Sequence, residues 1–320
     1  MRKKMAVLVG ALVLFATGAS AEYPEKPIQW VFPNNAGGGI HNLALSTLNI
    51  IQGDIPQSIN VTAMPGAGTV AGTRFVAEQP ADGYTFLFIH DAPFQTSAMG
   101  LLGFELLDQM EPVARVAQFC LGLFAAGDAP YSNLKELQAY ATEHPNEINA
   151  AINIGSLSHI NMLRLEEELG IDLNLVSVGG GGAASRQALI SGEIDLIDNS
   201  PTEIGSQVRA GDVTALAWYG SERHPSLSDL STMGEQGFQT PRTSCAYGYL
   251  WGRKDLPQEI KDYWSGIFTE AFSDPAKRDE LMERTNMPSA LLTGAELAKF
   301  SKEMNDERRS AFERFGLVKK

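Results

Sequence analysis

Four glycine-rich stretches are the parts of this chain best suited to hold a ligand. They lie near Gly37, Gly66, Gly155 and Gly180, and each follows a strand-like run and precedes a helical pattern. Glycine lets a ligand approach the backbone closely, and the start of a helix offers unpaired N–H groups with a partial positive charge. One such loop is a weak signal, because glycine also makes ordinary turns, but four together favour a site for a small anion.

Polar side chains at these junctions extend the same chemistry. Ser156 and His159 lie where a strand passes into a helix, so a hydroxyl, an imidazole and free amides can converge on one anion. His41 begins the first helix, where the helix dipole favours a neutral ring. A bound carboxylate would favour the protonated ring, so we expect binding to tighten as pH falls from about 8 to 6. The alternative is that His41 only caps its loop.

The first 21 residues are typical of a Sec-type signal peptide. Three cations at positions 2–4 precede an apolar run over residues 5–16, and small residues follow at 19–21 with the spacing that a signal peptidase recognises. The apolar run is too short for a lasting membrane span. We expect cleavage after Ala21 and a mature protein in the periplasm.

Motifs of the common enzyme classes do not occur in the sequence. It has no G-x-S-x-G, H-E-x-x-H, C-x-x-C or G-x-x-x-x-G-K-[ST] pattern. His41, His90 and His159 lack the short spacings of a metal site. The glycines of residues 66–72, with Asp91 beyond the next strand, resemble a dinucleotide fingerprint with altered spacing, but export argues against a soluble nicotinamide cofactor. We therefore expect no catalytic residue, no metal and no cofactor.

The balance of charge limits the partners. The chain has 38 acidic and 25 basic residues and a net charge of −13, and three of the basic residues lie in the signal peptide. Such an acidic mature surface argues against nucleic acid and anionic lipid as partners. A local site can still bind a small anion. No later run of eighteen apolar residues occurs, so we expect no membrane span in the mature chain.

Strand-like and helix-like segments alternate, which predicts an α/β fold with largely parallel sheets. In such sheets ligands bind beyond the carboxyl ends of the strands, where the glycine-rich loops lie. The predicted strands cover residues 28–32, 59–63, 84–89, 119–126, 148–154, 173–178, 194–198, 213–219 and 246–251. The predicted helices cover residues 41–51, 69–78, 134–143, 159–169, 184–191, 258–272 and 294–315.

Cys120 and Cys245 are the two cysteines of the chain. In an oxidising compartment such a pair can close a disulfide. Two buried free thiols fit the sequence equally well. The spacing supports neither a redox-active pair nor a cysteine-based zinc site.

Short motifs recur in a fixed order over nearly the whole mature chain. They are Y-P-x-K-P-I at 23–28, P-x-x-x-G-G-G at 33–39, a variant of P-G-A-G-G-x-x-G at 65–72, P-x-D-G-Y-T at 80–85, x-P-V-A at 111–114, G-S-x-x-H at 155–159, a variant of G-x-V-D…D-N with Ile194 in place of Val at 192–199, and R-x-P-x-L-x-D-x-x-T-x-x-E at 223–235. In this order they resemble the substrate-binding proteins of tripartite tricarboxylate transporters, the Bug family.

This chain departs from the family pattern in the first loops. The family usually has Asp where this chain has His41 and Arg where it has Leu45. Thr69 stands in place of the usual second glycine, and Ala63 in place of a common Asn. The resemblance therefore leaves open which ligand is bound, because an imidazole replaces a carboxylate beside the expected site.

The resemblance implies a two-domain, type II-like periplasmic binding protein that closes on its ligand like a hinged trap. Each domain would have a mixed, mostly parallel sheet flanked by helices, with the ligand cleft between the domains. One domain would combine residues 22–121 with 245–320, and the other would comprise residues 122–244. The two crossings near Cys120 and Cys245 would form the hinge, and we predict a disulfide between them.

The function implied by the resemblance is capture of a small organic acid for the permease subunits of a tripartite tricarboxylate-type transporter. The protein would be a monomer that binds no nucleic acid. A ligand-sensing partner of a membrane histidine kinase would use the same fold and site, and an exported enzyme is the remote alternative. The expected ligand-binding residues are Asn34, Asn35, Gly38, Gly39, His41, Gly66, Ala67, Gly68, His90, Asp91, Ser156, His159, Gly180, Gly181, Asp198 and Asn199.

Overall fold

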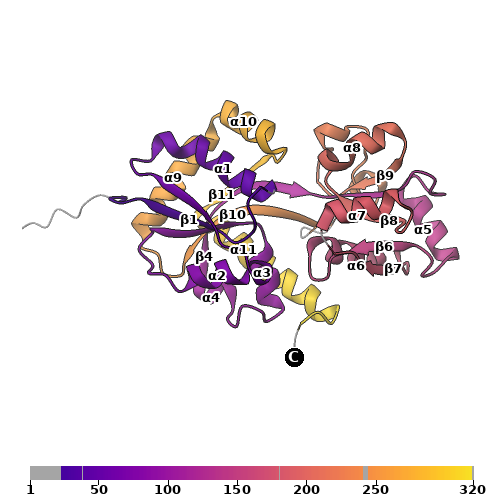
Figure 1. Cartoon of the computed structure of the whole chain (residues 1–320), viewed down its shortest axis with the longest axis horizontal. Coiled ribbons are helices and arrows are strands. Elements are labelled where there is room, and N and C mark those ends of the chain that lie inside the picture. The colour runs from indigo at the N-terminus through magenta and orange to yellow at the C-terminus, as the bar shows by residue number, and fades with distance from the viewer. Residues whose placement is uncertain (1–22, 38, 180, 241–243, 319–320) are drawn as a thin grey trace, which may run out of the picture.

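Two sheets, each with its own helices, form the molecule (Figure 1). The computed structural model describes residues 23–37, 39–179, 181–240 and 244–318. The expected signal peptide, residues 1–21, and two glycines of the expected site, Gly38 and Gly180, lie outside these ranges.

The first sheet has six strands in the order β11-β4-β10-β3-β1-β2. Its strands are β1 (Ile28–Phe32), β2 (Ile59–Ala63), β3 (Thr85–Ile89), β4 (Met110–Cys120), β10 (Cys245–Arg253) and β11 (Ser289–Thr293). Side chains of β3 alternate between its faces: Phe86 and Phe88 join one core, and Leu87 and Ile89 join the other. Both faces are therefore apolar and both are covered by helices.

The helices of the first domain form two layers around this sheet (Figure 1). On one face lie α1 (Gly39–Ile51), α9 (Gln258–Ser273) and α10 (Pro275–Thr285). On the other face lie α2 (Val70–Ala77), α3 (Ala92–Ala98), α4 (Leu106–Gln109) and α11 (Gly294–Arg314). The end of α11 also reaches the second domain, where Phe312 packs on Ile160 and Arg314 pairs with Glu167.

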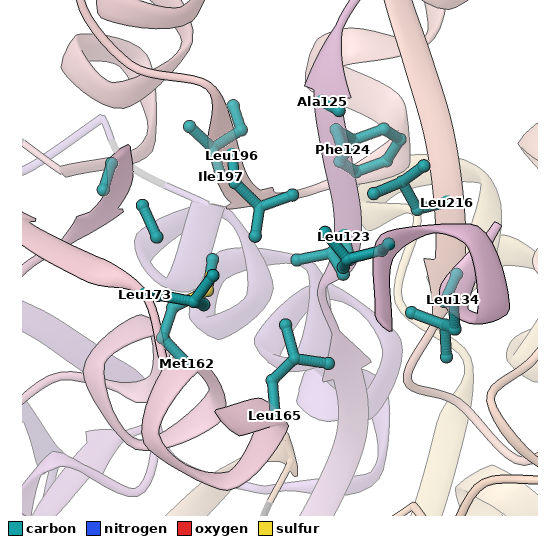
Figure 2. Close-up of a cluster of buried hydrophobic side chains, with 14 of the residues drawn as sticks. Leu123, Phe124, Ala125, Leu134, Met162, Leu165, Leu173, Leu196, Ile197 and Leu216 are labelled. Carbon is teal, nitrogen blue, oxygen red and sulfur yellow. The ribbon is translucent and has the colours of Figure 1, made fainter. Parts of the chain in front are cut away.

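The second sheet has five strands in the order β7-β6-β8-β5-β9. They are β5 (Gly122–Ala126), β6 (Asn149–Ile152), β7 (Asn174–Ser177), β8 (Leu196–Asn199) and β9 (Val213–Trp218), and the helices are α5 (Leu134–Glu143), α6 (Leu157–Leu169), α7 (Gly181–Ile190) and α8 (Pro201–Ala210). Figure 2 shows their shared core, in which Leu123 and Phe124 of β5 lie among leucines of the neighbouring strands and helices.

The strand directions match the predicted fold class. In the first sheet β1, β2, β3 and β4 run one way, and β10 and β11 run the other way. In the second sheet β6, β7, β8 and β9 share one direction and β5 opposes them. Both sheets are thus mixed, and the predicted α/β architecture is confirmed. The expectation of mostly parallel sheets is wrong: four of the nine strand pairs in the described ranges are parallel and five are antiparallel, because β10 and β11 in the first sheet and β5 in the second run against their neighbours.

The predicted strand 119–126 is wrong as a single element. β4 ends at Cys120 in the first sheet and β5 begins at Gly122 in the second, so the chain crosses between the sheets at Leu121. The two strands are mostly buried and follow each other directly. Their apolar residues therefore form one continuous hydrophobic segment in the sequence, which predicts a single strand. The chain returns at β10, whose Cys245 is paired in register with Cys120.

The predicted bridge between Cys120 and Cys245 is present. The two sulfur atoms are 1.95 Å apart and the two Cα atoms 4.2 Å apart. The disulfide joins the strand that leaves the first sheet to the strand that returns to it. The precise domain limits at 121/122 and 244/245 remain a prediction.

Candidate functional site

The topology brings loops from the two sheets opposite each other. β1, β2 and β3 run parallel to β4, so their carboxyl ends lie at the edge where β4 crosses to the second domain. β5 starts at that crossing and pairs antiparallel to β8 and β9, with Gly122 opposite Asn199 and Trp218. The carboxyl ends of β6, β7, β8 and β9 therefore point back toward the first domain. Such convergent ends are where open α/β sheets bind ligands.

His41 is held by its own loop. Its Nδ1 atom accepts a hydrogen bond from the Gly37 backbone N–H at 3.3 Å, and its ring lies against Phe32 with the centroids 5.2 Å apart. An accepting Nδ1 places the ring proton on Nε2. This contact agrees with the alternative that His41 caps its loop, and the expected contact of His41 with a bound carboxylate stays a prediction.

The same arrangement recurs at two further loops. Nδ1 of His159 accepts from the Gly155 N–H at 3.1 Å, four residues earlier, as His41 does from Gly37. Nδ1 of His90 accepts from the Ala92 N–H at 3.1 Å. Burial lowers the pKa of His159, and burial together with the nearby charge of Arg308 lowers the pKa of His90 to about 4. Each ring is thus a neutral group with an Nε2–H donor.

The loop after β2 has an unusual backbone. Gly66, Ala67, Gly68 and Thr69 have φ angles of 154°, 47°, 64° and 85° in succession. Two of these residues are not glycine, and such angles are sparsely populated by residues with a Cβ atom. The first three residues are exposed and Thr69 is buried, with no hydrogen-bond partner for its Oγ1 atom. Strain of this kind gathers at ligand-binding loops.

Small hydroxyl residues line the loop before α6. Ser156 is the N-cap residue of α6, and its Oγ lies 2.9 Å from Ser158 Oγ, which accepts from the Asn153 N–H. Ser156 is half-buried. Gly155 faces Met99 of the first domain, because a Cβ atom built on it would lie 2.9 Å from the sulfur. The domains therefore touch beside this loop.

Asn199 joins two helix starts in the second domain. Its Nδ2 atom donates to the Gly182 carbonyl at 2.9 Å, and its Oδ1 atom accepts from the Ser200 N–H at 2.8 Å. Gly181 begins α7 and Ser200 is the N-cap residue of α8. Asn199 is 1% exposed, so it positions the loops rather than presenting a free face to a ligand.

Asp198 lies beneath the same loops and is 4% exposed. Neither carboxylate oxygen has a hydrogen-bond partner among the described residues. Burial raises the pKa of Asp198 to about 7; Asn161 and Tyr219, the nearest polar groups, oppose the rise without reaching ordinary hydrogen-bond geometry. The sequence predicts that Asp198 contacts the ligand directly. In the structure its carboxylate is instead buried beneath the loops.

Asp91 has a structural role that the sequence did not suggest. It is fully buried, its Oδ2 atom lies 2.5 Å from Nη2 of Arg308 on α11, and its Oδ1 atom accepts from the Tyr247 N–H at 3.1 Å. Both oxygens are occupied, so the expected ligand contact is corrected to an ion pair that joins β3, β10 and α11. Arg308 lies in a charged helical run, where no sequence pattern separates it from solvent-facing neighbours.

The other expected residues lie on the facing loops. Asn35 and Gly39 are exposed and Asn34 is partly buried. A cavity of about 340 Å³ lies at the start of α8 and includes Asn286 of the first domain in its wall. A larger groove of about 790 Å³ lies beside β9 and contains none of the expected ligand-binding residues.

No group of three or more His, Cys, Asp and Glu side chains within the described ranges has the arrangement of a metal site. None of the helices in the same ranges has the length and apolarity needed to cross a membrane.

A model of the family described as "Tripartite tricarboxylate transporter family receptor" (TctC) matches residues 47–317. Among curated proteins, Protein BugT of Bordetella pertussis is 28% identical over 236 residues, which cover 72% of each chain. A protein of the UPF0065 group from Agrobacterium vitis is 27% identical over 289 residues, covering 89% of this chain and 83% of that protein.

Solved structures share the two-domain fold. The periplasmic binding protein BugD has a TM-score of 0.70 at 29% identity and covers 93% of this chain and 100% of its own. MatC from Rhodopseudomonas palustris with bound malate has a TM-score of 0.68 at 24% identity, with coverage of 90% and 99%. Another R. palustris protein, with adipate, has a TM-score of 0.72 at 20% identity, with coverage of 92% and 97%. The last two similarities concern the fold alone.

Proposed function

The chain belongs to the tripartite tricarboxylate transporter receptor family, and from this membership we propose that it captures a small carboxylate in the periplasm for a membrane transporter. It is a solute-binding protein of the TctC type. The class of ligand, the permease subunits as partners and the periplasmic location are the parts that we infer.

The opposed loops carry the proposal. Helix starts and the neutral imidazole Nε2–H groups of His90 and His159, one from each domain, lie at the converging carboxyl ends of the strands. Backbone N–H groups at helix starts and neutral donors suit a carboxylate, which accepts several hydrogen bonds at once. Each domain supplies part of such a site, so binding is expected to favour a closed arrangement of the domains.

The ligands of structural neighbours support the same class. MatC holds malate and the second R. palustris protein holds adipate. Both molecules are small dicarboxylates of different length and polarity. We therefore extend the class of small organic acids to this chain without choosing among its members.

A thermal-shift screen of mono-, di- and tricarboxylates, followed by calorimetric titration, tests the ligand class. A ligand that binds only the folded protein stabilises it by about 2.7 kcal/mol at a hundred times its Kd, which raises the melting temperature. We expect one group of acids to do so and uncharged analogues of the same length to have no effect. The absence of any stabilising acid in the panel would refute the proposal.

Substitution of Ser156 tests the place of the site. Loss of one charge-assisted hydrogen bond costs roughly 1.5–3 kcal/mol, so Ser156→Ala should weaken binding about tenfold or more with little change in stability. Ser206→Ala on the exposed side of α8 is the matched control, because its hydroxyl bonds only to the Gln207 side chain in the structure. Equal affinity of both variants and the wild type would move the site away from the loop before α6.

The membrane partner is tested separately. Ligand-loaded protein immobilised on beads should retain the permease subunits from detergent-solubilised membranes, and the ligand-free protein should retain less. Capture of a histidine kinase instead would support the sensing role.

A further inference from the structure

Two buried aspartates near the domain crossing differ in their partners. Asp91 has the guanidinium of Arg308 against one oxygen and the Tyr247 N–H against the other. Asp198 is just as deeply buried, yet both of its oxygens lack a hydrogen-bond partner among the described residues. Burying an unpaired carboxylate is costly, and the usual outcome is that it takes up a proton.

The neighbours of Asp198 are neutral. Asn161 on α6 and Tyr219 after β9 are the polar groups that influence it, and no Lys or Arg contributes within the described ranges. Burial and the adjacent Asp198 raise the pKa of Tyr219, so its hydroxyl stays protonated. Asn161 Nδ2 also donates to the Ser244 carbonyl at 3.4 Å, next to the disulfide at Cys245.

The surrounding elements bring few other charges. β5 places Leu123 beside Asp198, and the crossing strands contribute the disulfide. The other packed elements have these charged or titratable groups: His159, Arg164, Glu166, Glu167 and Glu168 on α6, Arg186 on α7, and Glu203 and Arg209 on α8, where Glu203 pairs with Arg186. Arg164 is influenced by Glu167, Glu307, Arg308 and Arg314 rather than by Asp198.

Asp198 also lies next to a residue that organises two helix starts of the proposed site. The following residue, Asn199, holds the starts of α7 and α8 together. An anion bound by the N–H groups at those helix starts would add a negative charge close to a second, ionisable one. Two like charges at short range in a poorly solvated place do not both ionise readily.

Given the proposed function, we propose that Asp198 makes carboxylate capture proton-linked: the ligand binds as an anion, and Asp198 takes one proton from solvent as the site fills. The proton adds to a carboxylate oxygen, so the bound state gains no net charge from a monoanion. In this proposal Asp198 lies behind the ligand site without touching the ligand, and its protonation compensates the charge of the bound anion.

The pKa of the buried carboxyl determines the pH range of this effect. Because burial raises the pKa of Asp198 to about 7, the carboxyl exchanges its proton near neutral pH. A bound anion raises that pKa further. For each unit of this further rise, the protein with Asp198 protonated binds the anion ten times more tightly than the protein with Asp198 ionised. Affinity should therefore rise about tenfold as pH falls from 8 to 6.

Calorimetric titration in phosphate and in Tris tests the proposal, because the difference in buffer ionisation enthalpy counts the protons taken up. The probe is malate or adipate, whichever stabilises the protein more in the thermal-shift screen. At pH 8 the wild type should take up most of one proton per ligand. Asp198→Asn should take up none and should bind at pH 8 as tightly as the wild type does at pH 6.

Asp195→Asn is the matched control on the same sheet. Asp195 precedes β8 at the opposite end and accepts hydrogen bonds from the backbone and side chain of Asn149. This variant should retain the wild-type proton uptake and pH profile. Proton uptake that persists in Asp198→Asn, or wild-type binding without uptake, overturns the proposal while leaving the carboxylate function intact. If no acid of the panel binds at either pH, the proposed function fails, and this proposal fails with it.

Discussion

At the scale of single residues, the buried carboxyl of Asp198 makes stability depend on pH. Its pKa rises from 3.8 to about 7 on folding, so the native state binds the extra proton between these values. This contribution is fully present below about pH 4 and is lost as pH rises through about 7. Asp198→Asn should therefore be more stable than the wild type at pH 8, by on the order of 4 kcal/mol, and nearly equal at pH 4.

Urea unfolding at several pH values measures this difference. Asp195→Asn serves again as the control, since its carboxylate is hydrogen-bonded in the native protein. Parallel stability curves for the wild type and Asp198→Asn across the whole pH range would show that Asp198 is ionised in the folded protein without penalty.

Thr69 offers a second prediction at the residue scale. Its φ of 85° is favourable for glycine and strained for a residue with a Cβ atom. Thr69→Gly should therefore be more stable than Thr69→Ala by about 1 kcal/mol. The order should reverse at Thr73, which lies inside α2, where glycine is the poorer helix former. The same order at both positions in chemical denaturation would mean that residue 69 is not strained.

The polar pairs also show what a sequence can and cannot reveal at this scale. Gly37 with His41 and Gly155 with His159 each lie four residues apart, so their hydrogen bonds belong to local patterns that repeat in the sequence. Asp91 and Arg308 are 217 residues apart. Their pairing depends on how α11 packs across the first domain, and no local spacing encodes that packing.

At the scale of elements, Asn199 determines how two helices start. Asn199→Ala leaves the Gly182 carbonyl and the Ser200 N–H without their partner, at a cost of about 2 kcal/mol in the free energy of unfolding. The starts of α7 and α8 should also become less ordered, so affinity should fall with stability. Asn199→Asp keeps the acceptor for Ser200 but sets an oxygen against the Gly182 carbonyl and a second buried carboxyl beside Asp198, so in urea unfolding at pH 8 it should lose at least as much stability as Asn199→Ala. A clearly smaller loss in Asn199→Asp than in Asn199→Ala would contradict this account.

The sequence missed buried and open elements alike: α8, α10 and β11 were not predicted although they have exposed or partly buried residues, and two further cases have burial as the cause. All residues of α3 are buried, so the helix has no polar face and no amphipathic period to detect. β4 and β5 are buried strands in direct succession, and their apolar residues give no sign of the crossing at Leu121. By contrast, elements with one open face, such as α1 and α5, follow the predicted ranges closely.

At the scale of the whole molecule, the disulfide constrains the unfolded chain. Cys120 and Cys245 close a loop with a sequence separation of 125, and removing so long a closure costs about 3–5 kcal/mol. The double variant Cys120→Ala/Cys245→Ala should lose this amount in chemical denaturation. The reduced wild type should lose a similar amount. A double variant as stable as the oxidised protein would show that the bridge adds no constraint.

The bridge also makes the entire stretch between the two cysteines a covalent ring attached to the first domain. While that ring is closed, the two crossings between the domains stay tied together at Cys120 and Cys245 even when either domain unfolds. A single proteolytic cut within residues 122–244 would likewise release nothing, and the nicked chain would separate into two pieces only after reduction.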